Sequence, residues 1–222
     1  MKNKICTVIL GVAVAVMILT FSIGLPIYFR PFYYWQIEPL DIPFYTDKTV
    51  EEIRAGYDEV LDYLTLPGGE FGAGSFAFSE EGAAHFADCK VLFNLNFFAF
   101  LISSAAVILL VILARRGRVA LWRPFGLDIP FFSGAGVLGA FLLIGAVVAA
   151  DFDTAFAVFH AIFFPGKDNW LFDPATDEII GAMPEEFFMN CAILIVSSII
   201  IISLTLMVIS IVRKHKTKKT VE

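Results

Sequence analysis

Residues 152–188 read FDTAFAVFHAIFFPGKDNWLFDPATDEIIGAMPEEFF and separate two apolar runs that are each long enough to cross a bilayer. Together with Asp151, the segment holds eight carboxylates against a single cation, Lys167. Charged side chains are costly inside a bilayer, so this segment lies in water or at the membrane surface. It also surrounds one histidine with more aromatic residues than a solvated linker needs. The chemistry of the protein is therefore expected here.

Outward from this segment, composition and hydropathy predict an integral membrane protein. Of the 222 residues, 58% are hydrophobic, against roughly 45–50% in ordinary soluble domains. The sequence predicts a mainly α polytopic membrane protein in which the whole chain, residues 1–222, forms a single integral membrane domain. Its four transmembrane helices are expected at about 5–29, 91–114, 130–150 and 187–212, and two extracytoplasmic segments, 30–90 and 151–186, are expected to form a small cap.

The distribution of charge predicts the orientation. Of the 22 acidic residues, 20 lie in residues 29–90 and 151–190. Eleven of the 16 lysines and arginines lie before the first span, between the second and third, or after the fourth: Lys2, Lys4, Arg115, Arg116, Arg118, Arg123, Arg213, Lys214, Lys216, Lys218 and Lys219. The positive-inside rule then places both termini in the cytoplasm and both acidic segments outside the cell membrane. The net charge of -6 averages two opposite faces, so it indicates no nucleic-acid partner, whereas the basic tail is expected to touch anionic membrane lipid.

Local signals predict helices in both outer segments. Thr49 followed by Glu52 is a capping box, and apolar residues at helical spacing predict an amphipathic helix over 50–66. A further helix is expected to begin at Ser79 and to run on into the second span. Asp153 or Thr154 is expected to cap a short helix ending at Pro165-Gly166, too short to span, so it should lie in the interface or dip into the bundle.

Small residues in the third span predict close helix contacts. Gly136 and Ala140 are four residues apart, a spacing that lets two helices approach closely. We expect them to pack within the chain, with dimerisation as the other reading.

Two of the three histidines are candidates for chemistry. His85 and His160 both lie on the outer side, near the membrane plane and among apolar or aromatic residues, whereas His215 lies in the basic tail and is expected to be a bystander. Asp88 and Cys89 follow His85 by three and four residues and share its helix face. The sequence has no H-x-x-x-H or H-E-x-x-H pattern and no Cys/His cluster, so no metal site is expected.

Two stretches resemble the bacterial lipoprotein intramolecular transacylase family. They are HFADCKVLF at 85–93 and FHAIFFPGKDNWLFDPATDEIIGAMPEEFF at 159–188. The residues that carry the resemblance are His85, Asp88, Phe159, His160, Trp170, Phe172, Asp173, Pro174, Asp177, Pro184, Glu185, Phe187 and Phe188. Cys89 departs from the pattern, because an apolar residue is expected there. The four-span layout also agrees with the family.

The resemblance implies an acyl shift at the outer face of the cell membrane. An ester-linked acyl chain, the sn-2 chain by expectation, would move from a diacylglyceryl-cysteine lipoprotein to the α-amino group of the same cysteine. It implies His85 as general base, oriented by Asp88, and His160 as oxyanion or proton donor; exchanging the two roles is equally compatible with the sequence. Supporting or substrate-positioning roles fall to Asp88, Trp170, Phe172, Asp177 and Glu185. No cofactor is implied, the substrate is a diacylated lipoprotein, and a monomer is expected.

Two other functions are also compatible with the sequence. Cys89, one helical turn from His85, could carry the acyl chain as a thioester. Alternatively, the protein could be a non-catalytic membrane adaptor whose aromatic loops bind a partner. Cys89 and Cys191 both lie near outer ends of spans, so a disulfide between them is conceivable.

Overall fold

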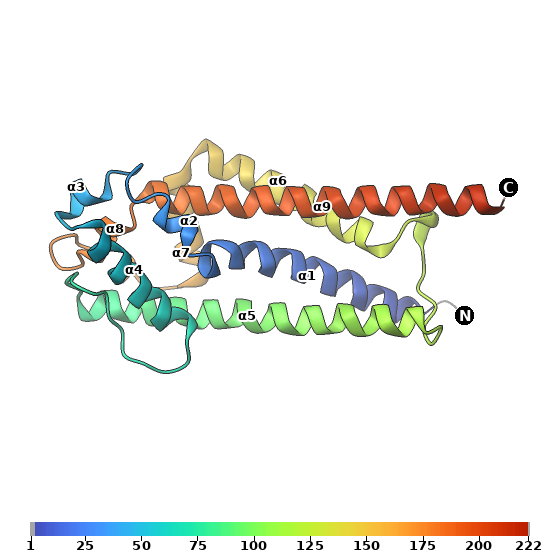
Figure 1. Ribbon diagram of the computed structural model, residues 1–222, viewed down its shortest axis with the longest axis horizontal. Coiled ribbons are helices and arrows are strands. Elements are labelled where there is room, and N and C mark those ends of the chain that lie inside the picture. Colours follow the sequence, from blue (N-terminus) through green and yellow to red (C-terminus); the bar gives the residue numbers. More distant parts are fainter. Residues whose placement is uncertain (1–2, 222) are drawn as a thin grey trace. The chain divides into compact units, whose positions relative to one another are not determined.

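The computed structural model describes residues 3–221, with side chains described up to residue 216. Lys2 and the side chains of Lys218 and Lys219 therefore lie outside the described residues. Figure 1 shows the helices α1 (Lys4–Tyr28), α2 (Pro31–Tyr34), α3 (Ile42–Thr46), α4 (Val50–Thr65), α5 (Glu80–Arg115), the 3-10 helix η1 (Pro124–Gly126), α6 (Ile129–Ala150), α7 (Phe152–Phe163), α8 (Ile179–Ala182) and α9 (Glu185–Val221). The described part of the chain has no β-strand, only an isolated bridge between Asn3 and Leu121.

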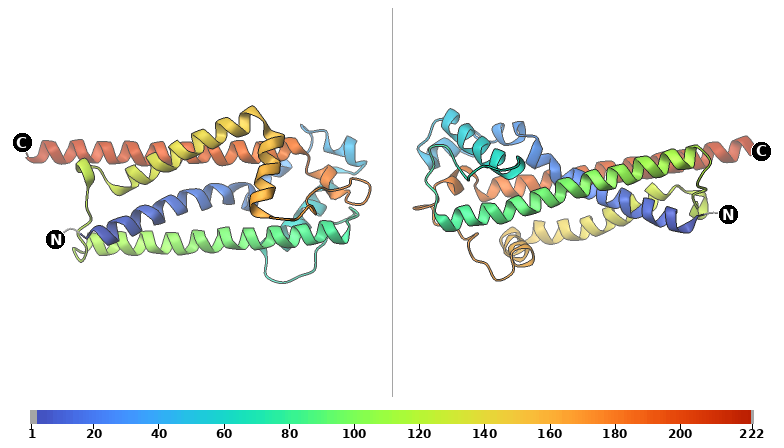
Figure 2. Two further views of the ribbon diagram at one scale, coloured as in Figure 1. Left: turned by 180° about the vertical axis from the view of Figure 1, so that it is seen from behind. Right: turned by 90° about the horizontal axis from the view of Figure 1, so that it is seen from below.

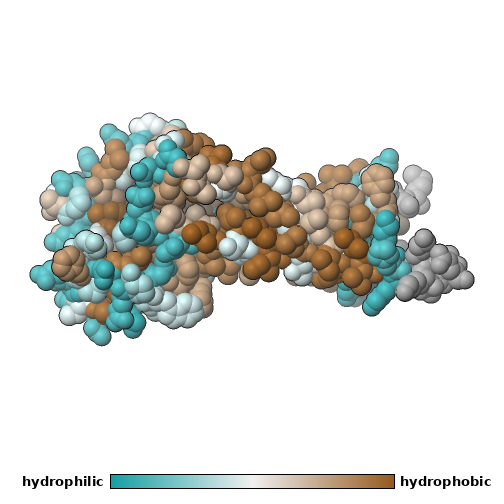
Figure 3. Space-filling model, turned by 90° about the horizontal axis from the view of Figure 1, so that it is seen from above, coloured by the Kyte–Doolittle hydropathy of each residue, from teal (hydrophilic) through white to brown (hydrophobic). Residues whose placement is uncertain are grey.

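The four predicted spans are confirmed as helices α1, α5, α6 and α9, each long and apolar enough to cross a membrane. Their outer surfaces are hydrophobic, as Figure 3 shows over much of the visible helical surface. Side chains such as Ile102, Leu143 and Ile201 are more than 60% exposed. In water such surface would be unfavourable, whereas in a bilayer it meets lipid tails. The chain is therefore a multi-pass membrane protein.

The helices contribute to two compact units. Unit 1 comprises residues 1–23, 97–146 and 195–222 and holds most of the apolar length of the four helices. Its core is formed by Leu10, Val14, Ile18, Leu110, Val137 and Ile199. At its basic end, Arg123 and Arg213 both pair with Asp128, and Ser210 Oγ accepts a hydrogen bond from the Asp128 backbone N–H.

Close helix contact in unit 1 uses a different glycine from the predicted one. A Cβ at Gly136 would meet no atom within 4 Å, and Gly136 and Ala140 are both exposed, so the predicted packing within the chain is wrong. The tight contact is made by Gly134, where a Cβ would lie 3.1 Å from the Ser203 carbonyl oxygen. Beside it, Ser133 Oγ donates to the Gly11 carbonyl at 2.8 Å.

Unit 2 comprises residues 24–96 and 147–194 and contains both acidic segments. Its core is rich in aromatic and branched side chains: Tyr33, Ile37, Ile42, Ile53, Tyr57, Val60, Leu61, Leu64, Phe76, Phe86, Ile179, Met183 and Phe187. Tyr33 and Tyr57 stack with ring centroids 3.7 Å apart, and the Tyr33 hydroxyl donates to the Ala182 carbonyl at 2.6 Å. That hydrogen bond ties the first acidic segment to the second.

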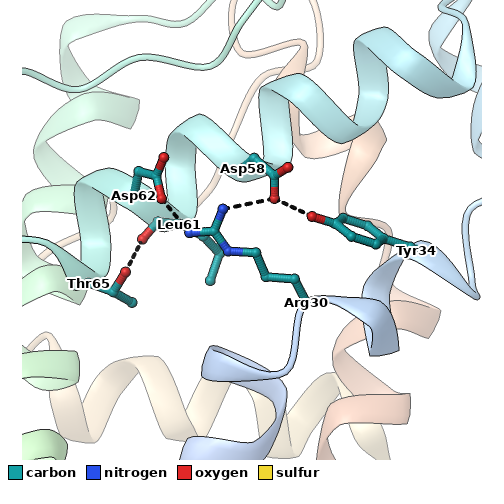
Figure 4. Close-up of polar contacts among 6 residues, drawn as sticks. All are labelled: Arg30, Tyr34, Asp58, Leu61, Asp62 and Thr65. Atoms are coloured by element: carbon teal, nitrogen blue, oxygen red, sulfur yellow. Dashed lines mark hydrogen bonds and ion pairs between the residues drawn. The ribbon is translucent and has the colours of Figure 1, made fainter.

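The amphipathic helix predicted over 50–66 is confirmed as α4. Both hydrogen bonds of the capping box between Thr49 and Glu52 are present. Its polar face is held by Arg30, which pairs with Asp58 at 3.0 Å and also with Asp62, while the Tyr34 hydroxyl donates to Asp58 (Figure 4). With its apolar face buried in the core of unit 2, α4 has a fixed place in that unit.

The short helix of the second acidic segment is also confirmed, but its cap is not the predicted one. The chain turns sharply between α6 and α7 (Figure 2). Asp151, in an extended conformation, accepts a hydrogen bond from the Thr154 N–H at 3.0 Å and caps α7, so the cap precedes the predicted Asp153 or Thr154. With 12 residues, α7 is about 18 Å long, well short of a bilayer core of about 30 Å.

Candidate active site

Unit 2 brings the two candidate histidines together. His85 comes from the second turn of α5 and His160 from the third turn of α7, and their ring centroids lie 5.7 Å apart. Each residue is only 5% exposed. Both rings can therefore serve a single small group of reacting atoms.

Aromatic side chains enclose the pair. Trp170 stacks on His160 with ring centroids 4.2 Å apart, and Phe156 lies on the same imidazole at 4.3 Å. Phe164 contacts both histidines, with its centroid 4.9 Å from His85 and 5.6 Å from His160. Phe172 lies 5.5 Å from His85. These rings restrict water, which strengthens hydrogen bonds and electrostatic interactions inside the site.

A backbone carbonyl orients His160. The Nδ1 atom lies 2.8 Å from the Phe156 carbonyl oxygen. Because a carbonyl can only accept, Nδ1 carries the proton, and the lone pair of the neutral imidazole is on Nε2. Burial lowers the pKa of His160, and the hydrogen bond to Phe156 opposes that effect only in part. The ring is therefore neutral at pH 7 with Nε2 able to accept a proton.

His85 is arranged differently. Its Nε2 lies 3.4 Å from Cys89 Sγ, and the Asn169 side chain also interacts with the ring, although the buried Nδ1 makes no hydrogen bond of normal geometry among the described side chains. A buried polar atom without a partner costs free energy, so it is often a site where a ligand binds. A Cys89 thiol that donates to Nε2 leaves the proton on Nδ1, which is then a buried donor.

Asp88 is held by residues other than the expected one. Lys167 Nζ donates to both Asp88 carboxylate oxygens at 2.6 Å, and Asn169 Nδ2 lies 3.5 Å from Oδ2. No direct hydrogen bond between Asp88 and His85 appears among the described contacts. Asp88 instead fastens residues 167–169 to α5, which places Phe164 and Trp170 against the histidines.

Asp177 fastens the other end of the same loop to the start of α5. It is 4% exposed, and its carboxylate accepts from the Ser79 N–H at 2.8 Å, from Ser79 Oγ at 2.9 Å and from Thr176 Oγ1 at 3.0 Å. A Cβ at Gly82 would collide with Asp177 Oδ1. Asp177 thus fixes the segment that carries Phe172, which lies against His85, to the start of α5.

Of the residues singled out in the sequence, Glu185 lies away from the histidines. It is exposed at the start of α9, beside Asp153. The residues that sequence reasoning missed are Asn169, Lys167, Phe156 and Phe164. Lys167 did carry a signal, being the single cation among eight carboxylates. Asn169 carried none, although its Oδ1 is buried without a partner among the described side chains.

All three cysteines, Cys6, Cys89 and Cys191, are free thiols. The disulfide considered between Cys89 and Cys191 is therefore not formed. Cys191 packs against the core of unit 2, whereas Cys89 is the only one of the three that contacts a candidate catalytic residue among the described hydrogen bonds.

Comparisons with known proteins agree with this fold. The family model of the lipoprotein intramolecular transacylase Lit matches residues 8–188. A sequence search of curated proteins found no match. Among solved structures, the membrane integral lipoprotein intramolecular transacylase Lit from Bacillus cereus is 25% identical, with a TM-score of 0.86 over 98% of this chain and 97% of that one.

Two further structures are of the same Bacillus cereus protein with one histidine replaced by arginine or by alanine. The arginine variant is 23% identical with a TM-score of 0.80, and the alanine variant 24% identical with a TM-score of 0.79. Each match covers 98% of this chain. It covers 94% of the chain of the arginine variant and 95% of the chain of the alanine variant. At these identities they show the shared fold.

The family match extends over most of the chain and includes both histidines, and it excludes the adaptor reading. Because the match covers residues 8–188, the chain belongs to the lipoprotein intramolecular transacylase family, Lit, and is a membrane-embedded acyltransferase.

Proposed function

We propose that the protein moves the sn-2 acyl chain of a diacylglyceryl-cysteine lipoprotein to the α-amino group of the same cysteine, with His85 and His160 as the catalytic pair. The observation that carries this proposal is the 5.7 Å separation of two buried imidazoles inside one aromatic enclosure. An acyl shift needs both a base and an oxyanion donor at one carbonyl, and two adjacent histidines can supply them.

In the reaction, the amine nitrogen attacks the ester carbonyl carbon. A C–N bond forms, the C–O bond to the glyceryl oxygen breaks, and one proton moves from nitrogen to that oxygen. The product is an amide-linked, lyso-form lipoprotein, and no other reactant is consumed. Because donor and acceptor belong to one molecule, positioning can supply much of the rate.

The tautomer of His160 favours His160 as the base. This assignment exchanges the roles first given to the two histidines, an exchange that the sequence left open. Its Nδ1–H is engaged by Phe156, so Nε2 is free to take the proton from the amine. The unperturbed α-amino pKa is about 7.7–8.0, so a neutral imidazole nearby can assist its deprotonation. The protonated His160 can then give this proton to the departing glyceryl oxygen.

His85 is proposed as the donor to the oxyanion. Its buried Nδ1 has no partner among the described side chains, so a developing negative charge would supply one. The site requires residues of only one chain, which is consistent with a monomer.

We propose that the site faces the outer surface of the cell membrane, with both termini in the cytoplasm. The acidic residues concentrated in unit 2 and the basic residues outside it support this orientation. On α7, Val158, Phe159, Ile162 and Phe163 are each about half exposed or more, while His160 is buried. Such a helix can place acyl chains on one side and the reacting groups on the other.

A lipopeptide with different chains tests the reaction. The purified full-length protein receives a substrate with palmitoyl at sn-1 and oleoyl at sn-2, and tandem mass spectrometry identifies the amide-linked chain. We expect oleoyl amide; palmitoyl amide would refute the sn-2 assignment. His85→Ala and His160→Ala should each lower the rate by roughly 10²–10⁴-fold. His215→Ala, in the tail, should match the wild type, and normal turnover in either of the first two would remove that histidine from the mechanism.

Cysteine labelling in intact cells tests the orientation. In a variant lacking Cys6, Cys89 and Cys191, Ala175→Cys in the exposed part of unit 2 should react with an impermeant maleimide before lysis. Arg118→Cys, in the basic connection, should react only after lysis. The reverse pattern would overturn the proposed topology.

A second mechanism is favoured by one observation, the 3.4 Å contact between Cys89 Sγ and His85 Nε2. A thiol beside an imidazole can form a thioester intermediate. We favour direct transfer, because the substrate already holds its own acceptor and a covalent intermediate gains little.

A further inference from the structure

Unit 1 contains a cavity of about 420 Å³ that the acyl shift does not use. Apolar side chains of three helices form its walls: Leu10 of α1, Val111 and Ala114 of α5, and Ile129 of α6. The connection between α5 and α6 adds Leu121 and Trp122 to the lining. Since α5 ends and α6 begins at its rim, the cavity lies where spanning helices leave the hydrocarbon.

Three arginines line the same cavity. Arg115, Arg123 and Arg213 come from the end of α5, from the connection and from α9. Asp128 is the one carboxylate in the lining, and it pairs with Arg123 at 2.8 Å and with Arg213 at 3.6 Å. In the sequence of unit 1, the only other acid is the terminal Glu222. The lining therefore holds three guanidinium groups and one carboxylate, a charge balance that favours binding of an anion.

Arg115 and Arg123 together have more donors than Asp128 can engage. Each guanidinium has five N–H donors in a planar fork, whereas a carboxylate accepts about four hydrogen bonds. Phosphate oxygens suit this fork better than they suit a lysine ammonium. The connection that carries Arg123 is also fixed in place: the Trp122 N–H donates to Thr7 Oγ1 at 2.9 Å, and Lys4 Nζ lies 5.8 Å from the Trp122 ring centroid.

We propose that this cavity is a binding site for one anionic phospholipid, with the phosphate at Arg115 and Arg123 and the start of an acyl chain between Val111 and Ile129. A free phosphate would accept hydrogen bonds from the arginines only, and the apolar walls of the cavity would remain in contact with water. A zwitterionic lipid brings a cation to a cavity that is already positive. Only an anionic lipid matches both the charge and the apolar lining.

Native mass spectrometry of the full-length protein in detergent tests the site. Dioleoyl phosphatidylglycerol is titrated against dioleoyl phosphatidylcholine, and inorganic phosphate is added as a competitor. We expect the first bound phosphatidylglycerol to bind about fivefold or more tighter than phosphatidylcholine, the effect of roughly one favourable cation–phosphate interaction. Inorganic phosphate at the same concentration should not displace it.

Two neighbouring arginines provide a matched pair of variants. Arg115 lines the cavity and Arg116 does not, although both are exposed at the end of α5. Arg115→Gln should weaken the first phosphatidylglycerol about fivefold, whereas Arg116→Gln should leave it within about twofold. Val111→Trp, which fills the apolar wall without changing charge, should also remove that lipid; its wild-type melting temperature in detergent would show that it is folded.

Three results would refute the proposal. They are equal affinity for the two lipids, equal loss in Arg115→Gln and Arg116→Gln, and full displacement by inorganic phosphate. Either of the first two results would mean that the arginines only set the orientation of the chain in the membrane. The third would mean that the cavity binds free phosphate.

Discussion

Lys167 and Asp88 form an ion pair in which one ammonium lies 2.6 Å from both carboxylate oxygens. The pair joins the loop after α7 to α5, and thereby joins the segment that carries Trp170 to the helix that carries His85. The bond holds the acidic loop over the histidines, and Asn169 of the same loop interacts with both Asp88 and His85.

The Lys167–Asp88 pair is expected to support activity through position. Lys167→Ala and Asp88→Ala should each lower the rate, and the double variant should lose little more than either single one, because the partners act together. A partly exposed pair contributes about 0.2–1 kcal/mol, which corresponds to at most about fivefold in rate. Turnover of the lipopeptide measures all three variants.

Two control variants accompany these single and double variants. Asp168→Asn removes an exposed charge from the same loop and should be neutral. Lys167→Arg keeps the charge and should restore most of the activity. Fully additive losses in the double variant would show that the pair does not act as a unit.

Cys89 separates the two mechanisms. If the amine attacks the ester directly, Cys89→Ala removes only a small side chain beside His85 and should retain most of the activity. If the thiol carries the acyl chain, the same variant should be as inactive as His85→Ala, and an acyl-enzyme should be detectable at position 89 by mass spectrometry. A loss above about a thousandfold in a folded Cys89→Ala protein would decide for the thioester.

The acidity of His160 gives a spectroscopic prediction. Burial lowers the pKa of its imidazole, so in the folded protein it should protonate only below the ordinary value of about 6.5. Its neutral form, which the proposed base requires, should predominate at pH 7 and be lost as the pH falls through that lowered pKa. NMR of the protein with isotope-labelled histidine measures this pKa directly. The signal of His160 is identified as the one that is missing in His160→Gln. A titration above pH 6.5 would contradict the proposed environment.

Gly82 and Gly136 form a matched pair for stability. A methyl group at Gly82 would collide with the buried Asp177 carboxylate, whereas at Gly136 it would meet open space. Gly82→Ala should therefore cost about 1–3 kcal/mol of stability, as overpacking does. Its Tm in detergent should fall by at least about 2 °C. Gly136→Ala should leave Tm unchanged or raised, and equal values for the two variants would contradict the contact at Asp177.

Local signals were sufficient for most of the fold. Hydropathy predicted the four spans because twenty apolar residues in a row have few alternatives to crossing a bilayer. The box of Thr49 and Glu52 predicted α4 because both hydrogen bonds lie within one turn. The cap of α7 was predicted two or three residues too late in the sequence. Asp151, the actual cap, follows α6 directly in an extended conformation, and no local sequence signal predicted that conformation.

The contacts that shape the site were beyond sequence reasoning because they are distant along the chain. Spacing placed Asp88 on the helix face of His85, three residues away, and the family resemblance implied that Asp88 orients it. A full positive charge at Lys167, 79 residues away, is the stronger partner for a carboxylate. Asn169 is further along the same loop, and its place beside Asp88 follows from that ion pair.

The hydrogen bond from His160 to the Phe156 carbonyl has a consequence for how long the proton stays on the ring. In catalytic triads a carboxylate holds the imidazole and stabilises its charged form. A neutral carbonyl orients the ring without adding a negative charge, so an imidazolium formed here would be short-lived. An imidazolium whose pKa is lowered by burial is well suited to return its proton to a poor leaving group such as a glyceryl alkoxide. The same residue would then be ready for the next lipoprotein without exchanging a proton with bulk water.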